Sequence, residues 1–402
     1  MKNFEDRWLK QAGNDMEKEL FKLDQHSLIV KESPAECPEF DGGPWTIQLF
    51  RSITNGSCIM NNENIFGIEE KGGSLNECQF IEKSIQKCMI REIRKAKKFI
   101  YLENQYFLGS AQDWSGDEST KCQHLIPAEL THKIKEKISL GEPFKVYIVI
   151  PLHPEGDPAD HIFQEILFWQ YRTMQFMYKE IASAIKEYGV EHTTHPTDYL
   201  NFFCLAKRES LHENNWDELQ LLEPYADTIA GKLRQTLRQP VYVHSKMSIF
   251  DDEFILVGSA NINQRALGGN RDTEIAVGGY QPGHTVDETG DPRGSIHTFR
   301  MALWTAHFGG YDKDYQNPGS DDCLSKVREK SQGFWEIYTQ EDPQHSDCHV
   351  LPYPIFVDVD GNVMELDKPW NCFPDTIAPV LGKKSELLGK LSTFKMLKKL
   401  TT

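Results

Sequence analysis

Hydrophobic positions along the chain follow two spacings, which predict helices and strands in turn. Helical spacing covers the first two dozen residues and the segments 80–97, 128–139, 158–188, 294–308 and 320–339. Short apolar or alternating runs predict strands at 45–53, 99–103, 144–150, 199–205, 241–250, 254–257 and 275–277. Because strands and helices alternate, we expect an α/β fold: a mixed β-sheet flanked by helices on both faces.

One stretch interrupts this alternation. Residues 54–76 are rich in Gly and Asn, which indicates an internal boundary. We therefore divide the chain into a part from 1 to 60, a linker from 61 to 76, a central part from 77 to 320, and a helical and irregular C-terminal region from 321 to 402.

Composition narrows the class of protein. The 402 residues carry 44 Lys and Arg against 60 Asp and Glu, a formal net charge of −16. This charge argues against a nucleic-acid partner, because such binders need a basic surface. Apolar stretches such as 146–152 are too short to span a bilayer, and the first residues lack the apolar core of a signal peptide. Nine scattered cysteines without a C-x-x-C pair are typical of reduced thiols. We expect a cytoplasmic protein.

The segment 240–279 concentrates the residues that could carry out chemistry. Its pattern predicts a strand over 241–250, and on such a strand His244 and Lys246 lie on the same face, about 7 Å apart. An imidazole beside an ammonium on an exposed strand face is unusual for a core and well suited to an anion. This pair marks the most informative candidate site.

Further polar residues follow within the same segment. Asp251 stands at the turn after the strand, where an aspartate usually bonds backbone N–H groups, so we expect a structural role for it. Ser259 and Asn261 lie in a small-residue loop at the end of the return strand, and Glu274 opens a third strand. We expect these last three side chains to meet His244 at one edge of the sheet.

Together these residue types fit displacement at a phosphodiester. Such a reaction needs a nucleophile, a proton donor for the leaving oxygen, and cations or hydrogen-bond donors around the phosphate. His244 could act as nucleophile or acid, and Lys246 would neutralise the phosphate. Ser259 and Asn261 would donate hydrogen bonds to it, while Glu274 would hold the imidazole tautomer. The scheme needs no metal or other cofactor.

This arrangement matches a known signature. The spacing H-x-K-x4-D from His244 to Asp251, followed by G-S-x-N at 258–261, resembles the HKD motif of the phospholipase D superfamily. Longer runs resemble plant-type phospholipase D: YVHSK at 242–246, GSANINQR at 258–265, DTEI at 272–275, FIYLENQYF at 99–107, FRMALW at 299–304 and FPDT at 373–376. The resemblance covers nearly the whole chain.

The resemblance implies a phospholipase D-type sandwich and a phosphoric diester hydrolase. Its substrates would be phosphatidylcholine and related phospholipids, and its products would be phosphatidic acid and a free headgroup. The enzyme would act at the surface of a membrane. It also implies that Gln105 contacts the substrate phosphate; a loop amide that bonds backbone is the alternative reading. The resemblance also implies that calcium is a possible cofactor, which the residues themselves do not indicate. Where relatives have Trp-x-Glu-His near a calcium site, this chain has Trp304-Thr-Ala306-His307, which lacks the carboxylate.

Relatives of this type carry two HKD motifs, and this chain contains one. The resemblance assigns residues 1–60 to the end of a first catalytic half and 77–320 to the second half. His244 would then be the acid and base, and the nucleophilic histidine would lie outside the chain. A homodimer or a separate N-terminal half could supply it. Two alternatives stay open: a truncated, non-catalytic lipid-binding fragment, and a phosphodiesterase of the superfamily acting on nucleic acid or as a homodimer.

Overall fold

The computed structural model describes residues 43–54, 81–109, 122–209, 228–284, 294–342 and 344–384. The helix predicted in the first two dozen residues and the linker predicted at 61–76 lie outside these ranges. Within them most of the predicted helices and strands are present, and the α/β class is confirmed.

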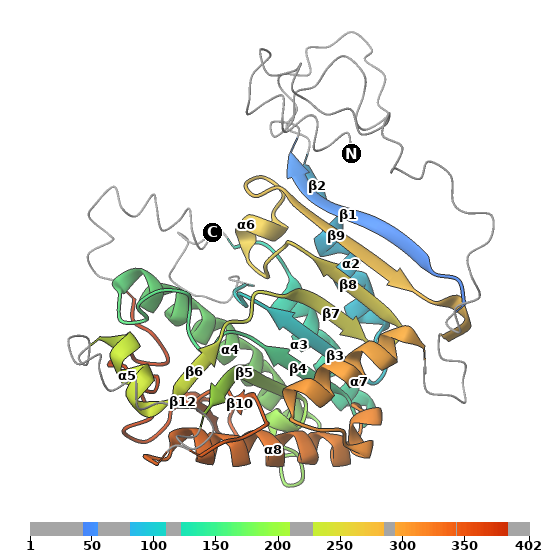
Figure 1. Cartoon of the computed structure of the whole chain (residues 1–402). Helices are drawn as coiled ribbons and strands as arrows, with labels where there is room; N and C mark the ends of the chain where they lie inside the picture. The colour runs from blue at the N-terminus through green and yellow to red at the C-terminus, as the bar shows by residue number, and fades with distance from the viewer. Residues whose placement is uncertain are drawn as a thin grey trace, which may run out of the picture.

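A mixed ten-stranded sheet forms the centre of the molecule (Figure 1). Its strand order is β10-β5-β4-β3-β7-β8-β9-β1-β2, and β6 pairs with β5 off this path. Strands β3, β4 and β5 are parallel, and their neighbours are antiparallel. The strands are β1 (Thr46–Thr54), β2 (Ile81–Lys83), β3 (Phe99–Asn104), β4 (Lys145–Val149), β5 (Leu200–Arg208), β6 (Arg238–Val241), β7 (Lys246–Phe250), β8 (Phe254–Gly258), β9 (Glu274–Tyr280) and β10 (Val350–Pro352).

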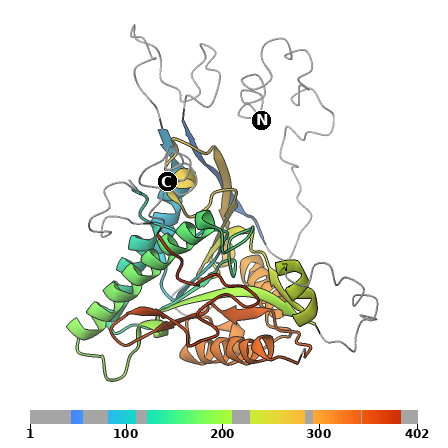
Figure 2. The same cartoon turned by 90° about the vertical axis from the view of Figure 1, so that its left-hand side faces the viewer.

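Helices cover both faces of this sheet (Figures 1 and 2). One face carries α2 (Ser84–Lys95), α3 (Ile126–Leu140) and α4 (His161–Glu187), of which α3 packs against both others. The other face carries α7 (Ser295–His307) and α8 (Asp321–Thr339). The remaining elements are α5 (Ile229–Thr236), α6 (Gln264–Leu267), 3-10 turns at Pro196–Asp198, Pro282–His284 and Lys313–Gln316, and a small hairpin of β11 (Ile355–Val357) and β12 (Val363–Glu365).

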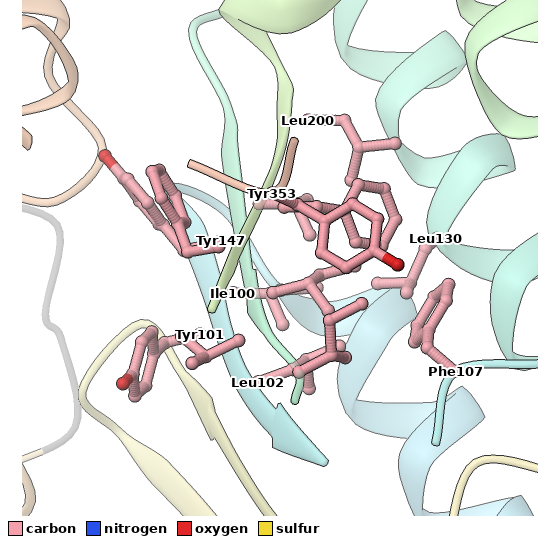
Figure 3. Close-up of a cluster of buried hydrophobic side chains, with 14 of the residues drawn as sticks. Ile100, Tyr101, Leu102, Phe107, Leu130, Tyr147, Leu200 and Tyr353 are labelled. Carbon is pink, nitrogen blue, oxygen red and sulfur yellow. The ribbon is translucent and has the colours of Figure 1, made fainter. Parts of the chain in front are cut away.

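The alternation along β3 divides the core between these two layers. Leu102 lies on the side of Leu130 from α3, whereas Tyr101 and Tyr147 point the other way (Figure 3). There the ring of Trp304 on α7 makes edge contacts with both tyrosines, at centroid distances of 5.5 and 5.2 Å. All five side chains are buried, so each face of β3 is fixed by its own helical layer.

The strand predicted over 241–250 is wrong. Val241 ends β6, which pairs with Leu205 on β5, whereas Lys246 begins β7, which pairs with Asn104 on β3. Because β4 lies between β5 and β3, one continuous strand cannot pair with both. Residues 242–245 therefore cross the sheet end as an irregular segment.

The β1 strand falls in the range 1–60 that the resemblance assigned to a first catalytic half. It pairs along its length with β9 and at its end with β2, so it is a strand of this sheet. Likewise β10, from the predicted C-terminal region, pairs with β5. Both ends of the described chain thus complete the same sheet as the central part.

Two expectations from composition can be compared with the described residues. The cysteines among them are free thiols: Cys88, Cys122, Cys204, Cys323, Cys348 and Cys372. Among the helices that the structure describes, none combines the length and apolar character needed to cross a bilayer.

Candidate functional site

The irregular segment 242–245 carries the first half of the motif across the carboxyl ends of β4 and β3. His244 is exposed on this segment, and Lys246 is the first residue of β7. The Lys246 Nζ atom donates hydrogen bonds to the His244 carbonyl oxygen, at 2.7 Å, and to Oε1 of Gln105, at 3.0 Å. The predicted proximity of the two residues is therefore present, although a backbone crossing and not a shared strand face produces it.

Gln105 lies at the centre of the site, just past the end of β3. Its Oε1 accepts hydrogen bonds from Lys246 and from Nδ2 of Asn261, the latter at 3.3 Å. Its Nε2 donates to the hydroxyl of Tyr242 at 2.9 Å, and the Tyr242 ring lies 6.2 Å from the ring of His244. The amide oxygen of Gln105 thus lies between a cation and an amide donor, and its amide nitrogen bonds the tyrosine whose ring neighbours His244.

Ser259 and Glu274 form a second pair at the same sheet edge. The Ser259 hydroxyl donates to a Glu274 carboxylate oxygen and accepts from the backbone N–H of Ile275 at 3.1 Å. We expected Glu274 to hold the imidazole; instead its carboxylate bonds Ser259 and not His244. The pair does place a carboxylate within electrostatic reach of Lys246.

Burial changes the acidity of both charged groups. It raises the pKa of Glu274, assisted by the nearby Asp272 and opposed by Ser259 and Lys246. It lowers the pKa of Lys246, against the opposing effect of Glu274. Both shifts disfavour charge in a half-buried place, and an anionic ligand beside Lys246 would relieve the second of them.

Asp251 lies at the opposite end of β7 and takes no part in this cluster. Its carboxylate accepts hydrogen bonds from the backbone N–H groups of Lys97, Lys98 and Phe99, at 2.6, 2.9 and 2.8 Å. The residue has a φ of 54°, a left-handed conformation that aspartate tolerates better than most residues. It joins the β7–β8 turn to the start of β3, as an aspartate at a turn was expected to do.

Three residues near the site were not among the predicted ones. Glu103 at the end of β3 is buried and bonds both Ser245, the middle residue of H-x-K, and His307 at the end of α7. The sequence pattern predicted no role for Glu103 or Ser245. The signal that could have identified Glu103 is its place at the end of an otherwise apolar strand, because a buried carboxylate needs hydrogen-bond partners.

The segment 304–307, where the resemblance implied a calcium site, does not offer a set of ligands that fits calcium. Position 306 is alanine, and His307 Nε2 bonds Glu103 Oε1 at 2.9 Å. Both oxygens of Glu103 accept hydrogen bonds from side chains. Calcium needs six to eight oxygen ligands, and the described residues hold no cluster of three or more acidic, His or Cys side chains that could bind a metal.

The phospholipase D family model matches residues 1–382 of this chain. The chain therefore belongs to the phospholipase D family. It is 44% identical over 397 residues to "Phospholipase D alpha 1" of Brassica oleracea var. capitata and 45% identical over 398 residues to the protein of the same name from Zea mays. Each alignment covers 97% of this chain and 48% of the relative, so the chain spans about half the length of these relatives.

Solved structures are more distantly similar. The phospholipase D family member Nuc from Salmonella typhimurium is 14% identical, with a TM-score of 0.26, over 59% of this chain and 84% of that one. Phosphatidylserine synthase from Haemophilus influenzae Rd KW20 is 11% identical, with a TM-score of 0.33, over 89% of this chain and 47% of that one.

Proposed function

We propose that this chain supplies the acid and base half of a phospholipase D active site, which hydrolyses phosphatidylcholine and related phospholipids to phosphatidic acid and a free headgroup. One observation carries the proposal: Lys246 and Asn261 converge on a single acceptor oxygen, that of Gln105, and Lys246 also bonds the carbonyl oxygen of the exposed residue His244. A phosphate oxygen is a stronger acceptor than an amide oxygen for a lysine ammonium, so a phosphodiester can take this place.

The proposed reaction has two steps with balanced proton transfers. A histidine nitrogen from the other HKD motif attacks phosphorus, the bond from phosphorus to the headgroup oxygen breaks, and His244 gives its proton to that oxygen. Water then attacks phosphorus, the bond from phosphorus to nitrogen breaks, and His244 takes the proton from water. Lys246 and Asn261 stabilise the charge on the phosphate oxygens throughout.

In this proposal the nucleophile comes from outside these 402 residues, and an exposed aliphatic face supports a docking place for the part that carries it. Leu49 on β1, Val277 on β9 and Val257 on β8 lie opposite one another across three strands, and Ile47 and Ile275 extend the row. Their exposed fractions lie between 44% and 62%. Further along the sheet this same face is covered by α7, at Tyr101.

This aliphatic face adjoins the site. Ile275 follows Glu274 directly, and its backbone bonds Ser259. A polypeptide bound to the aliphatic face would therefore also reach the sheet edge that carries Ser259 and Glu274. Burial of these apolar side chains would favour its association. The partner is a separate N-terminal half or a second copy of this chain, and the experiments below separate the two.

The test measures choline release from phosphatidylcholine vesicles. We expect little release by the chain alone at low concentration, and strong release when it is mixed with the N-terminal half of Zea mays phospholipase D alpha 1, ending before the matched region. Specific activity that rises with concentration of the chain alone, together with a species near twice 46.3 kDa in sedimentation, would identify a homodimer instead. Full activity of a monomer would contradict the proposal.

A lysine in the aliphatic face should block this pairing. We expect Val277→Lys to lower complemented activity at fixed concentration by about tenfold or more, because burying an unpaired ammonium is costly. Its side chain is half exposed in the free chain, so the free energy of unfolding should change by about 0.5 kcal/mol or less. The matched control is Ile377→Lys, at a residue that is 80% exposed and outside this face. Equal activity of both variants would exclude the aliphatic face as the docking place.

The rival functions give different results in the same assays. A non-catalytic lipid-binding fragment would sediment with phosphatidylcholine vesicles whether or not His244 is replaced by Ala, and would release no choline in any mixture. A phosphodiesterase of nucleic acid would hydrolyse DNA faster than short-chain phosphatidylcholine. We expect faster hydrolysis of phosphatidylcholine than of DNA, because the net charge of −16 disfavours binding of a polyanion. We also propose that the chain acts in the cytoplasm, peripherally at membranes.

A further inference from the structure

We propose that Glu103, His307 and Ser245 form a hydrogen-bonded clamp that positions His244 and Lys246, the neighbours of Ser245, for reaction. The inference rests on the proposed function and adds positioning residues to it. Glu103, His307 and Ser245 are called the clamp below.

The clamp is built from three segments that are far apart in the chain. Glu103 is 5% exposed near the end of β3, and its Oε2 accepts a hydrogen bond from the Ser245 hydroxyl at 2.6 Å. Its Oε1 accepts from the hydroxyl of Tyr101 at 2.6 Å and bonds Nε2 of His307 at 2.9 Å. His307 is the last residue of α7. The Glu103 carboxylate therefore joins the sheet, a covering helix and residues 242–245, which are called the motif segment.

The motif segment depends on such a contact because it lies outside the sheet. Residues 242–245 belong to no strand, so no ladder of backbone hydrogen bonds fixes them. Two side-chain contacts flank His244 instead: Tyr242 with Gln105 at 2.9 Å, and Ser245 with Glu103. A hydrogen bond to an ionised carboxylate is stronger than one between neutral groups, which makes Ser245 the firmer of the two anchors.

The surroundings keep the Glu103 carboxylate ionised. Burial by itself raises its pKa, but the hydrogen bonds from His307, Ser245 and Tyr101 outweigh burial and leave the pKa below the ordinary value of 4.5. The clamp is therefore formed at neutral pH. Its contribution to stability is present above pH 4.5 and is lost as the pH falls through the lowered pKa.

The clamp residues act through another group. Glu103 is buried and contacts Ser245, whereas His244 and Ser245 are exposed. Losing the clamp should thus leave the charge of Lys246 and the chemistry of the imidazole unchanged, while the two groups lose their fixed geometry. A misplacement of about 1 Å at a reacting group can cost roughly a hundredfold in rate.

The experiment compares Ser245→Ala with Ser245→Thr, which keeps a hydroxyl at the same place. In the complemented enzyme we expect Ser245→Ala and Glu103→Gln to lower kcat for choline release by roughly 10- to 100-fold, with KM nearly unchanged. Ser245→Thr should stay close to wild type. The matched control is Ser139→Ala, at an exposed serine that bonds only the backbone of its own helix.

A second readout needs no activity. In a proton–carbon NMR spectrum of the histidine rings of the chain alone, the His244 signal is assigned with His244→Asn. We expect Ser245→Ala to shift or broaden this signal and Ser245→Thr to keep the wild-type signal, while melting curves show that both variants are folded. A His244 signal and a kcat that are both indifferent to Ser245→Ala would overturn the clamp. If wild type releases no choline while the signal still responds, the proposed function fails and the clamp stands.

Discussion

His244→Asn should abolish choline release by the complemented enzyme, lowering kcat by about 10³-fold or more. In the proposed reaction the imidazole gives a proton to the leaving headgroup and takes one from water, and a positioned acid–base group contributes roughly 10²–10⁴-fold. Asparagine fills a similar volume but cannot exchange a proton near neutral pH. Binding should persist, because Lys246 and Asn261, which converge on the oxygen of Gln105, are unchanged in this variant.

The control for this variant is His192→Asn, at a histidine whose side chain is 91% exposed and lies outside the site. It should keep wild-type kcat and KM. Choline release by His244→Asn within tenfold of wild type would contradict the role of His244. Such a result would favour the lipid-binding alternative or would assign the acid and base role to a different residue.

Asp252→Asn should lower the free energy of unfolding by about 3–5 kcal/mol. The Asp252 carboxylate accepts two hydrogen bonds from Arg300, both at 2.7 Å, and bonds Nδ1 of His297 at 2.9 Å. Arg300 is fully buried, and its remaining nitrogen donates to the backbone oxygen of Tyr315 at 2.8 Å. Removing the one carboxylate leaves a buried guanidinium unpaired, which costs about that much.

Asparagine is chosen because it removes the charge of the side chain and keeps its shape. Asp252 has a φ of 57°, and asparagine adopts this left-handed conformation as readily as aspartate. The control is Asp160→Asn, since Asp160 caps the start of α4 through a hydrogen bond to Ile162 N–H that asparagine can also accept. Urea unfolding should show a lower midpoint at unchanged slope for Asp252→Asn alone. Equal midpoints for both variants would contradict the argument.

The same carboxylate should shape the acid stability of the protein. Burial raises the pKa of Asp252, but hydrogen bonds from His297 and Arg300 outweigh burial and leave the pKa below its ordinary value of 3.8. Its stabilisation is therefore present above pH 3.8 and is lost as the pH falls through the lowered pKa. The difference in stability between wild type and Asp252→Asn should shrink in that acidic range, as measured by urea unfolding.

Local spacing predicted the parts of the fold that depend on one segment at a time. The short apolar run at 99–103 predicted β3 closely, because a strand buried on both faces is apolar throughout. The helical spacing of 158–188 gave α4 closely, since one buried stripe covers its length. The break in the strand 241–250 could not be predicted, because β6 and β7 have different partners and strand order leaves no local trace.

The sequence by itself determined the type of chemistry. The residue types and spacing of His244, Lys246, Ser259 and Asn261 indicated a phosphate site, because an anion needs cations and donors wherever the chain places them. Tertiary structure decided how they meet. Asn261 lies 156 residues from Gln105, and His307 lies 204 residues from Glu103, and each pair bonds directly. Contacts over such separations depend on which strands and helices pack together, and this packing is a property of the whole sheet that no local pattern encodes.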